Sequence, residues 1–290
     1  KLDGDMTLLV RYIGVALKEW ARSQQFSEPE RNFCWLSTLP ELKRRRCMDT
    51  RMLETLNRRN LGTLETPTNS YSDAYALTTA IAVGLFYNKD RMDQWEIDRL
   101  GAEAVALTYG SPTAFLSGAV LTHMLSRVVQ GCDPDIRSLV ADTVDAIQIQ
   151  FGRQYHQTAT LWEVLQMALT LAESEELTQM EAMERLSCRT ASEVLAGAVY
   201  ACATCHDDFD AAMIAAVNHS GRSAAVGAIT GAILGARMGE EALPEFYLEC
   251  LEPADLLREL ADDMHTGCPM EMGNRLFDLD WDYKYLNGGQ

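Results

Sequence analysis

The chain has 290 residues, of which 47% are hydrophobic, and carries a formal net charge of −17. This composition is typical of a folded globular protein and excludes a disordered chain, while the length permits one domain or two closely packed halves. The negative charge repels a phosphate backbone, so we expect no nucleic-acid partner.

The sequence also indicates a compartment. No charged-then-apolar leader follows Lys1, and no run approaches the roughly 20 apolar residues that cross a bilayer. We therefore expect a cytoplasmic, soluble protein without a membrane partner. Eight cysteines are too dilute for a disulfide scaffold. Several of them fall in helical runs, where free thiols pack as small hydrophobic groups: Cys188, Cys202, Cys205 and Cys250.

Apolar residues recur at intervals of three and four along the chain, whereas strand signals are nearly absent. The pattern predicts an all-α fold, a compact multi-helix bundle of about ten helices. In chain order, the predicted helices are Thr7–Trp20, Asp73–Phe86, Asp98–Leu107, Thr113–Val129, Asp135–Phe151, Thr160–Leu171, Ala191–Ala203, Asp208–Ala216, Ala224–Met238 and Ala254–Met264.

One basic cluster stands out between the first two predicted helices. Lys43–Arg46 is followed by Arg51, Arg58 and Arg59. The cluster could bind an anion, but charge runs of this kind usually mark a solvated face. We interpret it as solvated.

The predicted helix Ala224–Met238 is made of small residues on nearly every side, with Gly227, Gly231 and Gly235 spaced four apart. A glycine inside a helix costs about 1 kcal/mol relative to alanine, so these positions need a packing reason. We expect this helix to be central and buried, where neighbouring backbones approach closely.

Three motifs have both a functional and a structural interpretation. Cys202-Ala-Thr-Cys-His206 matches the pattern for haem attachment, but no export signal or second ligand accompanies it, and no second Cys/His pair suggests zinc. Asp207–Asp210 could hold a metal, but acidic residues also favour a helix N-terminus, and we predict a cap. His123 and His156 are isolated and are interpreted as packed or surface residues.

Within residues 209–264, Ala216-Val217-Asn218 precedes a turn, a helix reading GAITGAILGA and a final L-x-x-LA helix. In order and spacing, this segment resembles the C-terminal part of the ADP-ribosylglycohydrolase family. Thr108–Pro112 resembles the family's T-H-G-x-P turn, Glu193–Ala196 its E-A-L-A helix and Asp3–Leu8 its acidic N-terminal turn. The resemblance implies an all-α domain over residues 1–266. Residues 267–290, with their acidic-aromatic segment, are interpreted as a C-terminal extension, either an appended arm or a short irregular segment.

The resemblance implies hydrolysis of the bond between ADP-ribose and an acceptor, with two divalent cations held between two acidic turns. Mg²⁺ needs several oxygen ligands, and carboxylates must offset its charge. Here Arg222, Ser223, Ala224 and Ala225 stand where the family has Asp-x-Asp-Thr. Only the N-terminal turn keeps carboxylates. We therefore expect no metal cofactor and no catalytic residue.

The sequence leaves two roles open for Arg222. Arg222 could take the place of a metal and pair with Asp3, or it could face solvent after the site decayed. The candidate ligand-binding residues are Asp3, Asp5, Tyr109, Ser111, Gly221, Arg222 and Ser223. The two turns and Thr108–Ser111 are expected to meet at one concave site.

Two functions follow from this interpretation. The first is a catalytically degenerate protein that retains a cleft for an ADP-ribose-like or other anionic, nucleotide-like small molecule, or that serves as an interaction module. The alternative is an active hydrolase that removes ADP-ribose with a remodelled, metal-poor site. The sequence leaves the oligomeric state open.

Overall fold

The described residues of the chain form an all-α structure. The computed structural model describes residues 7–25, 33–45, 49–86, 92–132, 135–267 and 278–289. These ranges contain helices and turns but no strand, and an isolated bridge pairs Asp73 with Thr190. The predicted fold class is confirmed. None of the described helices is long and apolar enough to span a bilayer.

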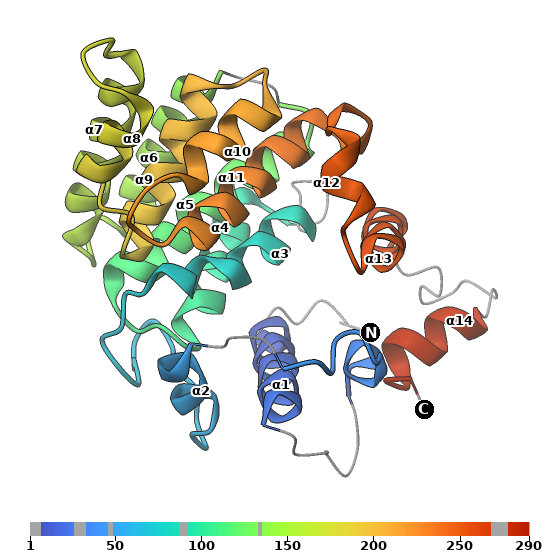
Figure 1. Cartoon of the computed structure of the whole chain (residues 1–290). Helices are drawn as coiled ribbons and strands as arrows, with labels where there is room; N and C mark the ends of the chain where they lie inside the picture. The colour runs from blue at the N-terminus through green and yellow to red at the C-terminus, as the bar shows by residue number, and fades with distance from the viewer. Residues whose placement is uncertain are drawn as a thin grey trace. The chain divides into compact units, whose positions relative to one another are not determined.

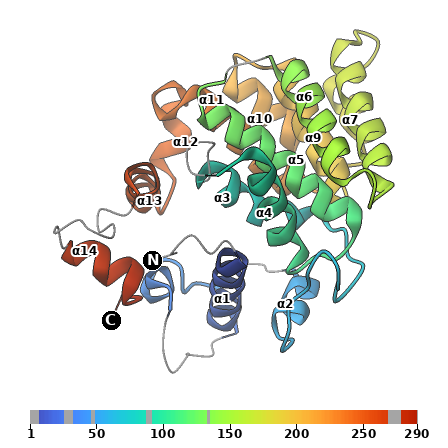
Figure 2. The same cartoon turned by 180° about the vertical axis from the view of Figure 1, so that it is seen from behind.

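Figures 1 and 2 show the arrangement of the helices from two sides. The α-helices are α1 (Thr7–Gln24), α2 (Thr50–Leu56), α3 (Thr78–Phe86), α4 (Gln94–Ala106), α5 (Pro112–Val129), α6 (Ile136–Phe151), α7 (Gln157–Glu173), α8 (Gln179–Arg185), α9 (Ala191–Thr204), α10 (Phe209–Val217), α11 (Ser223–Met238), α12 (Glu245–Glu249), α13 (Ala254–Thr266) and α14 (Leu279–Trp281). The 3₁₀ helices are η1 (Trp35–Thr38), η2 (Ala74–Leu77) and η3 (Glu240–Ala242), and η4 (Asp282–Leu286) is a π-helical turn.

Every predicted helix is present, with differences at its ends. Residues 74–77 of the second predicted helix form η2, and α4 begins four residues earlier than expected, at Gln94. The prediction missed α2, α8 and α12, which are short. For the described part of the C-terminal extension, the alternative of an irregular segment was wrong, because residues 279–286 are helical.

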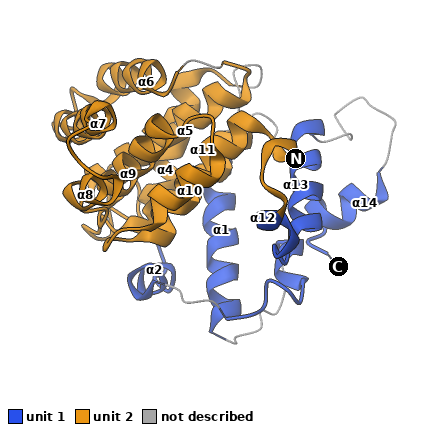
Figure 3. Cartoon of the chain, turned by 45° about the horizontal axis from the view of Figure 1, so that its top comes forward, with its two compact units in different colours: residues 1–61, 246–290 blue, residues 62–245 orange. Residues whose placement is uncertain are grey.

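By the contacts between their residues, the parts of the chain group into two compact units, which Figure 3 shows in different colours. Unit 1 comprises residues 1–61 and 246–290, and unit 2 comprises residues 62–245. Contacts alone do not define a domain, so the division of the sequence into 1–266 and 267–290 stays a prediction.

The core of unit 2 is built around α5. This helix packs against α3, α4, α6, α7, α9 and α11, and Figures 1 and 2 show it within this group. Every residue from Ala114 to Ser126 is buried. A helix that is apolar on all sides belongs in a core, and its few polar groups have partners: the Thr122 hydroxyl donates to the carbonyl of Ala80 at 3.2 Å.

Three glycines let α3, α4 and α5 approach closely. A Cβ on Gly101 of α4 would lie 2.2 Å from Thr122 Oγ1, and one on Gly118 of α5 would lie 2.5 Å from Val105 Cγ2. A Cβ on Gly84 of α3 would lie 2.7 Å from the Cβ of Leu125. These contacts are too short for any side chain, so the packing of the three helices requires glycine at all three positions.

The small-residue helix α11 is buried on one face. It packs against α3, α5, α9 and α10, and Ala225, Ile229 and Ile233 on this face are at most 2% exposed. On its other side Ala224 and Ala228 are exposed, so the expectation of a central, buried helix holds for one face only. A Cβ on Gly235 would have no neighbour within 4 Å.

In unit 1, a buried carboxylate joins α1 to η1. Glu19 is 3% exposed and accepts hydrogen bonds from the backbone N–H of Phe33 at 2.9 Å, that of Cys34 at 3.2 Å and the Ser37 hydroxyl. Burial, and then the charge of Glu19, raise the pKa of the Cys34 thiol to about 11. Cys34 is therefore a neutral, unreactive thiol at physiological pH.

The C-terminal residues belong to the same unit through Lys284. Its ammonium, 8% exposed, contacts the carboxylates of Glu259 and Asp263 on α13 and of Asp280. Burial alone would lower the pKa of Lys284, but the hydrogen bonds to Asp280 and Glu259 outweigh burial and raise it. A buried cation so compensated fixes the geometry of the elements that supply its partners.

Aromatic contacts complete the attachment of this segment. The ring of Tyr285 packs edge-on against Trp35 of η1, with centroids 6.3 Å apart, and its hydroxyl donates to Asp263 at 2.6 Å. Gly289 has a positive φ, and a Cβ there would lie 3.2 Å from the Cβ of Trp35. The described C-terminal residues and η1 are thus parts of one packed unit.

Candidate functional site

The turn that leads into α11, Ser220–Ser223, packs closely against the loop after α8. A Cβ on Gly221 would lie 2.4 Å from the carbonyl oxygen of Ser187 and 2.8 Å from the Cβ of Cys188, so only glycine fits. The Arg222 N–H donates to the carbonyl of Cys188 at 2.8 Å. Ser187 and Cys188 have φ values of 61° and 51°, in the left-handed region that non-glycine residues rarely adopt. Backbone strain of this kind persists only where the surroundings hold it.

A carboxylate of α8 holds the same turn. Glu184 accepts hydrogen bonds from the backbone N–H and the hydroxyl of Ser220, both at 2.6 Å. His219 contributes locally, since its Nδ1 accepts from the Gly221 N–H at 3.0 Å. The turn is therefore fixed by protein groups and needs no ion to keep its shape.

The hydrogen bonds from Ser220 to the Glu184 carboxylate make the turn sensitive to acid. The hydrogen bonds from the Ser220 hydroxyl and N–H lower the pKa of Glu184. A lowered pKa means that the stabilisation from these hydrogen bonds is fully present above the ordinary glutamate pKa of about 4.3. It is lost as pH falls through the folded-state pKa of Glu184.

We expect the amide chemical shift of Ser220 to titrate with a midpoint below the ordinary glutamate pKa. Glu184→Gln should abolish the transition, and the Ser111 amide, which donates to a carbonyl, should not follow it. A midpoint at or above the ordinary glutamate pKa would contradict the hydrogen bonds between Glu184 and Ser220.

The turn between α4 and α5, Thr108–Ser111, is clamped by Asn69. The side-chain N–H of Asn69 donates to the carbonyl of Thr108 at 2.9 Å, and its oxygen accepts from the N–H groups of Gly110 at 2.9 Å and Tyr71 at 3.0 Å. A Cβ on Gly110 would lie 2.2 Å from the carbonyl oxygen of Asn69. One amide side chain therefore sets the position of the turn.

Backbone hydrogen bonds link the two turns through residues 71–73 and 188–191. The Ser111 N–H donates to the carbonyl of Tyr71 at 3.2 Å, and the Ala191 N–H donates to that of Ser72 at 2.9 Å. Cys188, three residues before Ala191, accepts from Arg222. The N-termini of α5, α9 and α11 thus lie along one hydrogen-bonded group of segments within unit 2.

The predicted ligand-binding residues fall in different environments. Arg222 is exposed and is the N-cap of α11, while Gly221, Ser223 and Ser111 are half-buried. Tyr109 is 1% exposed, so its side chain lies within the core.

Backbone hydrogen bonds through residues 71–73 and 188–191 connect the segments 108–111 and 221–223. Asp3 and Asp5 lie outside the described residues. The pairing of Asp3 with Arg222 stays a prediction.

The described residues of the α11 turn do not fit a divalent cation. Arg222, Ser223, Ala224 and Ala225 supply no carboxylate, and the guanidinium brings a positive charge. The carboxylate of Glu184 already accepts two hydrogen bonds from Ser220. Within the described ranges no three His, Cys, Asp or Glu side chains gather as metal ligands. Any ions would have to be held chiefly by the N-terminal acidic turn, which is outside those ranges.

The other motifs have structural roles. Asp208 is the N-cap of α10 and accepts from the Ala211 N–H at 3.0 Å, which confirms the predicted cap. Cys202 is buried in α9, and burial raises its pKa. His206 follows α9 and contacts Asp207 at 2.8 Å. Cys250, by contrast, is exposed just after α12, so its expected packing inside a helix was wrong.

His123 is a packed residue, as predicted, and it has a buried partner. Its Nδ1 lies 2.9 Å from Oδ2 of Asp98, and the side-chain N–H of Gln94 donates to the other carboxylate oxygen at 2.8 Å. Asp98 is 1% and His123 6% exposed. The pair joins α4 to α5 inside unit 2.

Sequence reasoning missed Asn69, Glu184 and the Ser187–Cys188 turn. One short signal was available: Thr178-x-x-Glu181 is a capping box at the start of α8, and it places Glu184 one helical turn further on. No local pattern marks the contact of Asn69 with the turn, because Thr108 and Gly110 lie about 40 residues away in the sequence.

The comparison with known families agrees with this architecture. The family whose sequence profile matches the chain is described as ADP-ribosylglycohydrolase, and the match covers residues 5–273. No curated protein matches the sequence. The match extends over nearly the whole chain and includes both turns, α11 and the helices that hold them. The chain therefore belongs to the ADP-ribosylglycohydrolase family.

Proposed function

We propose that this chain is a catalytically degenerate member of its family that keeps a site for an ADP-ribose-like or another anionic small molecule. The observation that carries the proposal is Arg222, an exposed cation at the N-cap of α11. The resemblance puts the family's metal-binding carboxylates at this turn. A guanidinium repels the divalent cations that the family's chemistry needs, so an anion is the better occupant.

The rigidity of the turn supports binding without catalysis. Gly221 fits against Ser187 and Cys188, and Glu184 holds Ser220. These contacts are made by protein atoms alone. The loss of the metal ligands therefore removes the chemistry but leaves the frame in which a ligand can be positioned.

The electrostatics of the frame also favour an anion. The helices α5 and α11 have 18 and 16 residues, and their N-termini lie along linked segments. At the N-terminus of α9, the Glu193 carboxylate already accepts from the N–H groups of Arg189 and Thr190. The N-terminus of a helix carries about half a positive charge and exposes N–H groups, which favours a negatively charged group nearby. Arg222 adds a planar donor suited to a phosphate or a carboxylate.

Calorimetric titration with ADP-ribose tests the proposal. We expect binding with the same affinity in EDTA and in Mg²⁺, and about tenfold weaker binding by Arg222→Ala, the effect of removing one charge-assisted hydrogen bond. Arg153→Ala, an exposed arginine outside the turn, is the matched control and should bind as the wild type does.

Three results would redirect the interpretation. Affinity that depends on Mg²⁺, together with release of ADP-ribose from an ADP-ribosylated protein, would favour the alternative of an active hydrolase. Equal affinity of the wild type and Arg222→Ala would exclude the guanidinium as a ligand. No binding of ADP-ribose or of simple anions at this turn would favour an interaction module.

A further inference from the structure

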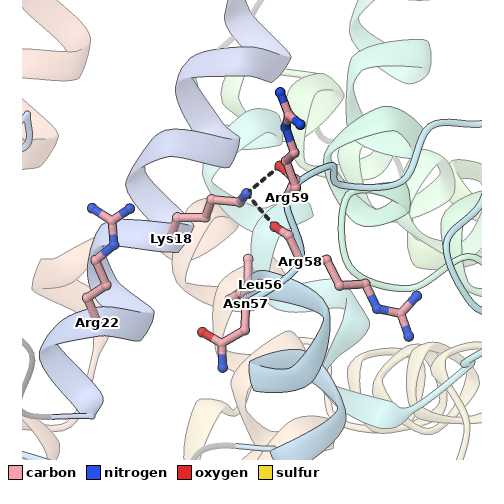
Figure 4. A pocket seen from close by; sticks show the side chains of 6 residues that line it. All are labelled: Lys18, Arg22, Leu56, Asn57, Arg58 and Arg59. Atoms are coloured by element: carbon pink, nitrogen blue, oxygen red, sulfur yellow. Dashed lines mark hydrogen bonds between the residues drawn. The ribbon is translucent and has the colours of Figure 1, made fainter.

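A separate group of positive charges lines a hollow in unit 1. Lys18 and Arg22 come from α1, and Arg58 and Arg59 follow the end of α2 (Figure 4). The hollow measures about 250 Å³, and its other lining residues are Leu56 and Asn57. None of these lining residues is acidic. The sequence marked Arg58 and Arg59 as a solvated cluster, and the fold adds two cations from a helix more than 30 residues away.

Lys18 lies between the two chain segments. Its ammonium donates to the carbonyl oxygen of Arg58 at 2.7 Å and to that of Arg59 at 2.9 Å. These bonds use two of the three N–H donors of the ammonium. Burial, and then the nearby charge of Arg22, lower the pKa of Lys18. The charges of Lys18 and Arg22 are thus close enough to repel each other, and a bound anion would relieve this repulsion.

Arg22 and Arg59 are not neutralised by the protein. Both are exposed, and within the described ranges neither guanidinium has a carboxylate at ion-pair distance. The chain has 42 acidic and 25 basic residues, so partners are plentiful. Other arginines use them: Arg44 pairs with Glu252 at 3.0 Å and Arg137 with Glu173 at 2.6 Å. Two unpaired arginines beside one hollow therefore leave a local positive field.

We propose that this hollow binds a compact anion through a phosphate or diphosphate group. Lys18 supplies its third N–H, and Arg22 and Arg59 close over the anion. In Figure 4 these two guanidinium groups extend outward from Lys18, and both are exposed, so they are free to turn toward a ligand. The volume is below the roughly 300–1,000 Å³ of sites for drug-sized ligands, so the ligand is small.

The charge of the whole chain does not prevent such binding. At physiological ionic strength the Debye length is about 8 Å, so exposed charges beyond this distance are largely screened. A phosphate inside the hollow interacts mainly with the cations that line it. Binding should therefore weaken as salt is raised.

The experiment is a calorimetric titration of the full chain with inorganic diphosphate in magnesium-free buffer. The test variant is Arg22→Gln/Arg59→Gln. The control is Arg11→Gln/Arg45→Gln, which removes the same charge from exposed residues that do not line the hollow. We expect about tenfold or greater weakening in the test variant and less than about twofold in the control. Both should unfold at the wild-type temperature, because none of the four guanidinium groups is needed for packing.

This inference does not depend on the proposed function. Repeating the titration with Arg222→Ala separates the two sites, since the loss at Arg22 and Arg59 should be unchanged in that background. ADP-ribose titrated in parallel shows whether a nucleotide or a free diphosphate is the better source of the group. Equal weakening in test and control variants, or no heat with the wild type at millimolar diphosphate, would overturn the proposal and leave Lys18 as a link between α1 and α2.

Discussion

Gly221→Ala should destabilise the protein by about 3 kcal/mol. The new Cβ would lie 2.4 Å from the Ser187 carbonyl oxygen and 2.8 Å from two atoms of Cys188, and most of these are backbone atoms that cannot rotate away. Overpacking of this kind typically costs 1–3 kcal/mol, and the strained backbone of Ser187 and Cys188 has little room to relax. Denaturant unfolding followed by circular dichroism measures the change.

The control for this variant is Gly231→Ala in the helix that follows. A Cβ there meets only Met213 Sδ at 3.8 Å, an ordinary contact. We expect no loss of stability from it. If Gly221→Ala unfolds at the wild-type denaturant concentration, the loop after α8 is looser than described, and the turn cannot be the rigid frame that the proposed function needs.

Gly101→Ala should destabilise unit 2 by about 2–3 kcal/mol. Its Cβ would lie 2.2 Å from Oγ1 and 2.6 Å from Cβ of Thr122, whose hydroxyl also holds α3 through Ala80. The substitution therefore pushes α4 and α5 apart and strains a buried hydrogen bond. In the double variant Gly101→Ala/Thr122→Ala, the loss should be less than the sum of the two single losses, because the clash is shared.

The opposite sign is expected for Gly235→Ala. The new methyl group would have no neighbour within 4 Å, and alanine is favoured over glycine inside a helix by about 0.5–1 kcal/mol. Thermal unfolding of both variants compares them directly. A stabilising Gly101→Ala would mean that α4 and α5 do not pack as closely as the structure has them.

The helices of unit 2 were readable from the sequence because burial leaves a periodic pattern. For α5 even the start was within one residue, since Pro112 after Gly110-Ser111 marks a helix N-terminus. The start of α4 was missed although Asp93 and Glu96 form a capping box. Residues 279–286 gave no periodic signal, because tertiary contacts of Lys284 and Tyr285, rather than an apolar face, hold them.

The candidate site could be predicted only in part. The resemblance identified Gly221 and Arg222, and the structure adds the reason that Gly221 must be glycine. The left-handed Ser187 and Cys188 could not be anticipated, because serine and cysteine rarely adopt that conformation and no neighbour in the sequence marks it. The clamp by Asn69 is a long-range contact, and a single sequence carries no signal for such pairs.

Unit 1 is built from two segments that are far apart in the sequence, and this separation affects folding during synthesis. Its part up to residue 61 is synthesised before its partners around Lys284, which come after residue 245. About 180 residues separate the two parts, which at roughly 5–20 residues per second is a delay on the order of ten seconds or more. During this time Trp35 has no Tyr285 to cover it. The helices before residue 61 therefore complete their packing only after unit 2 has been synthesised, and chaperones and proteases can reach them during this interval.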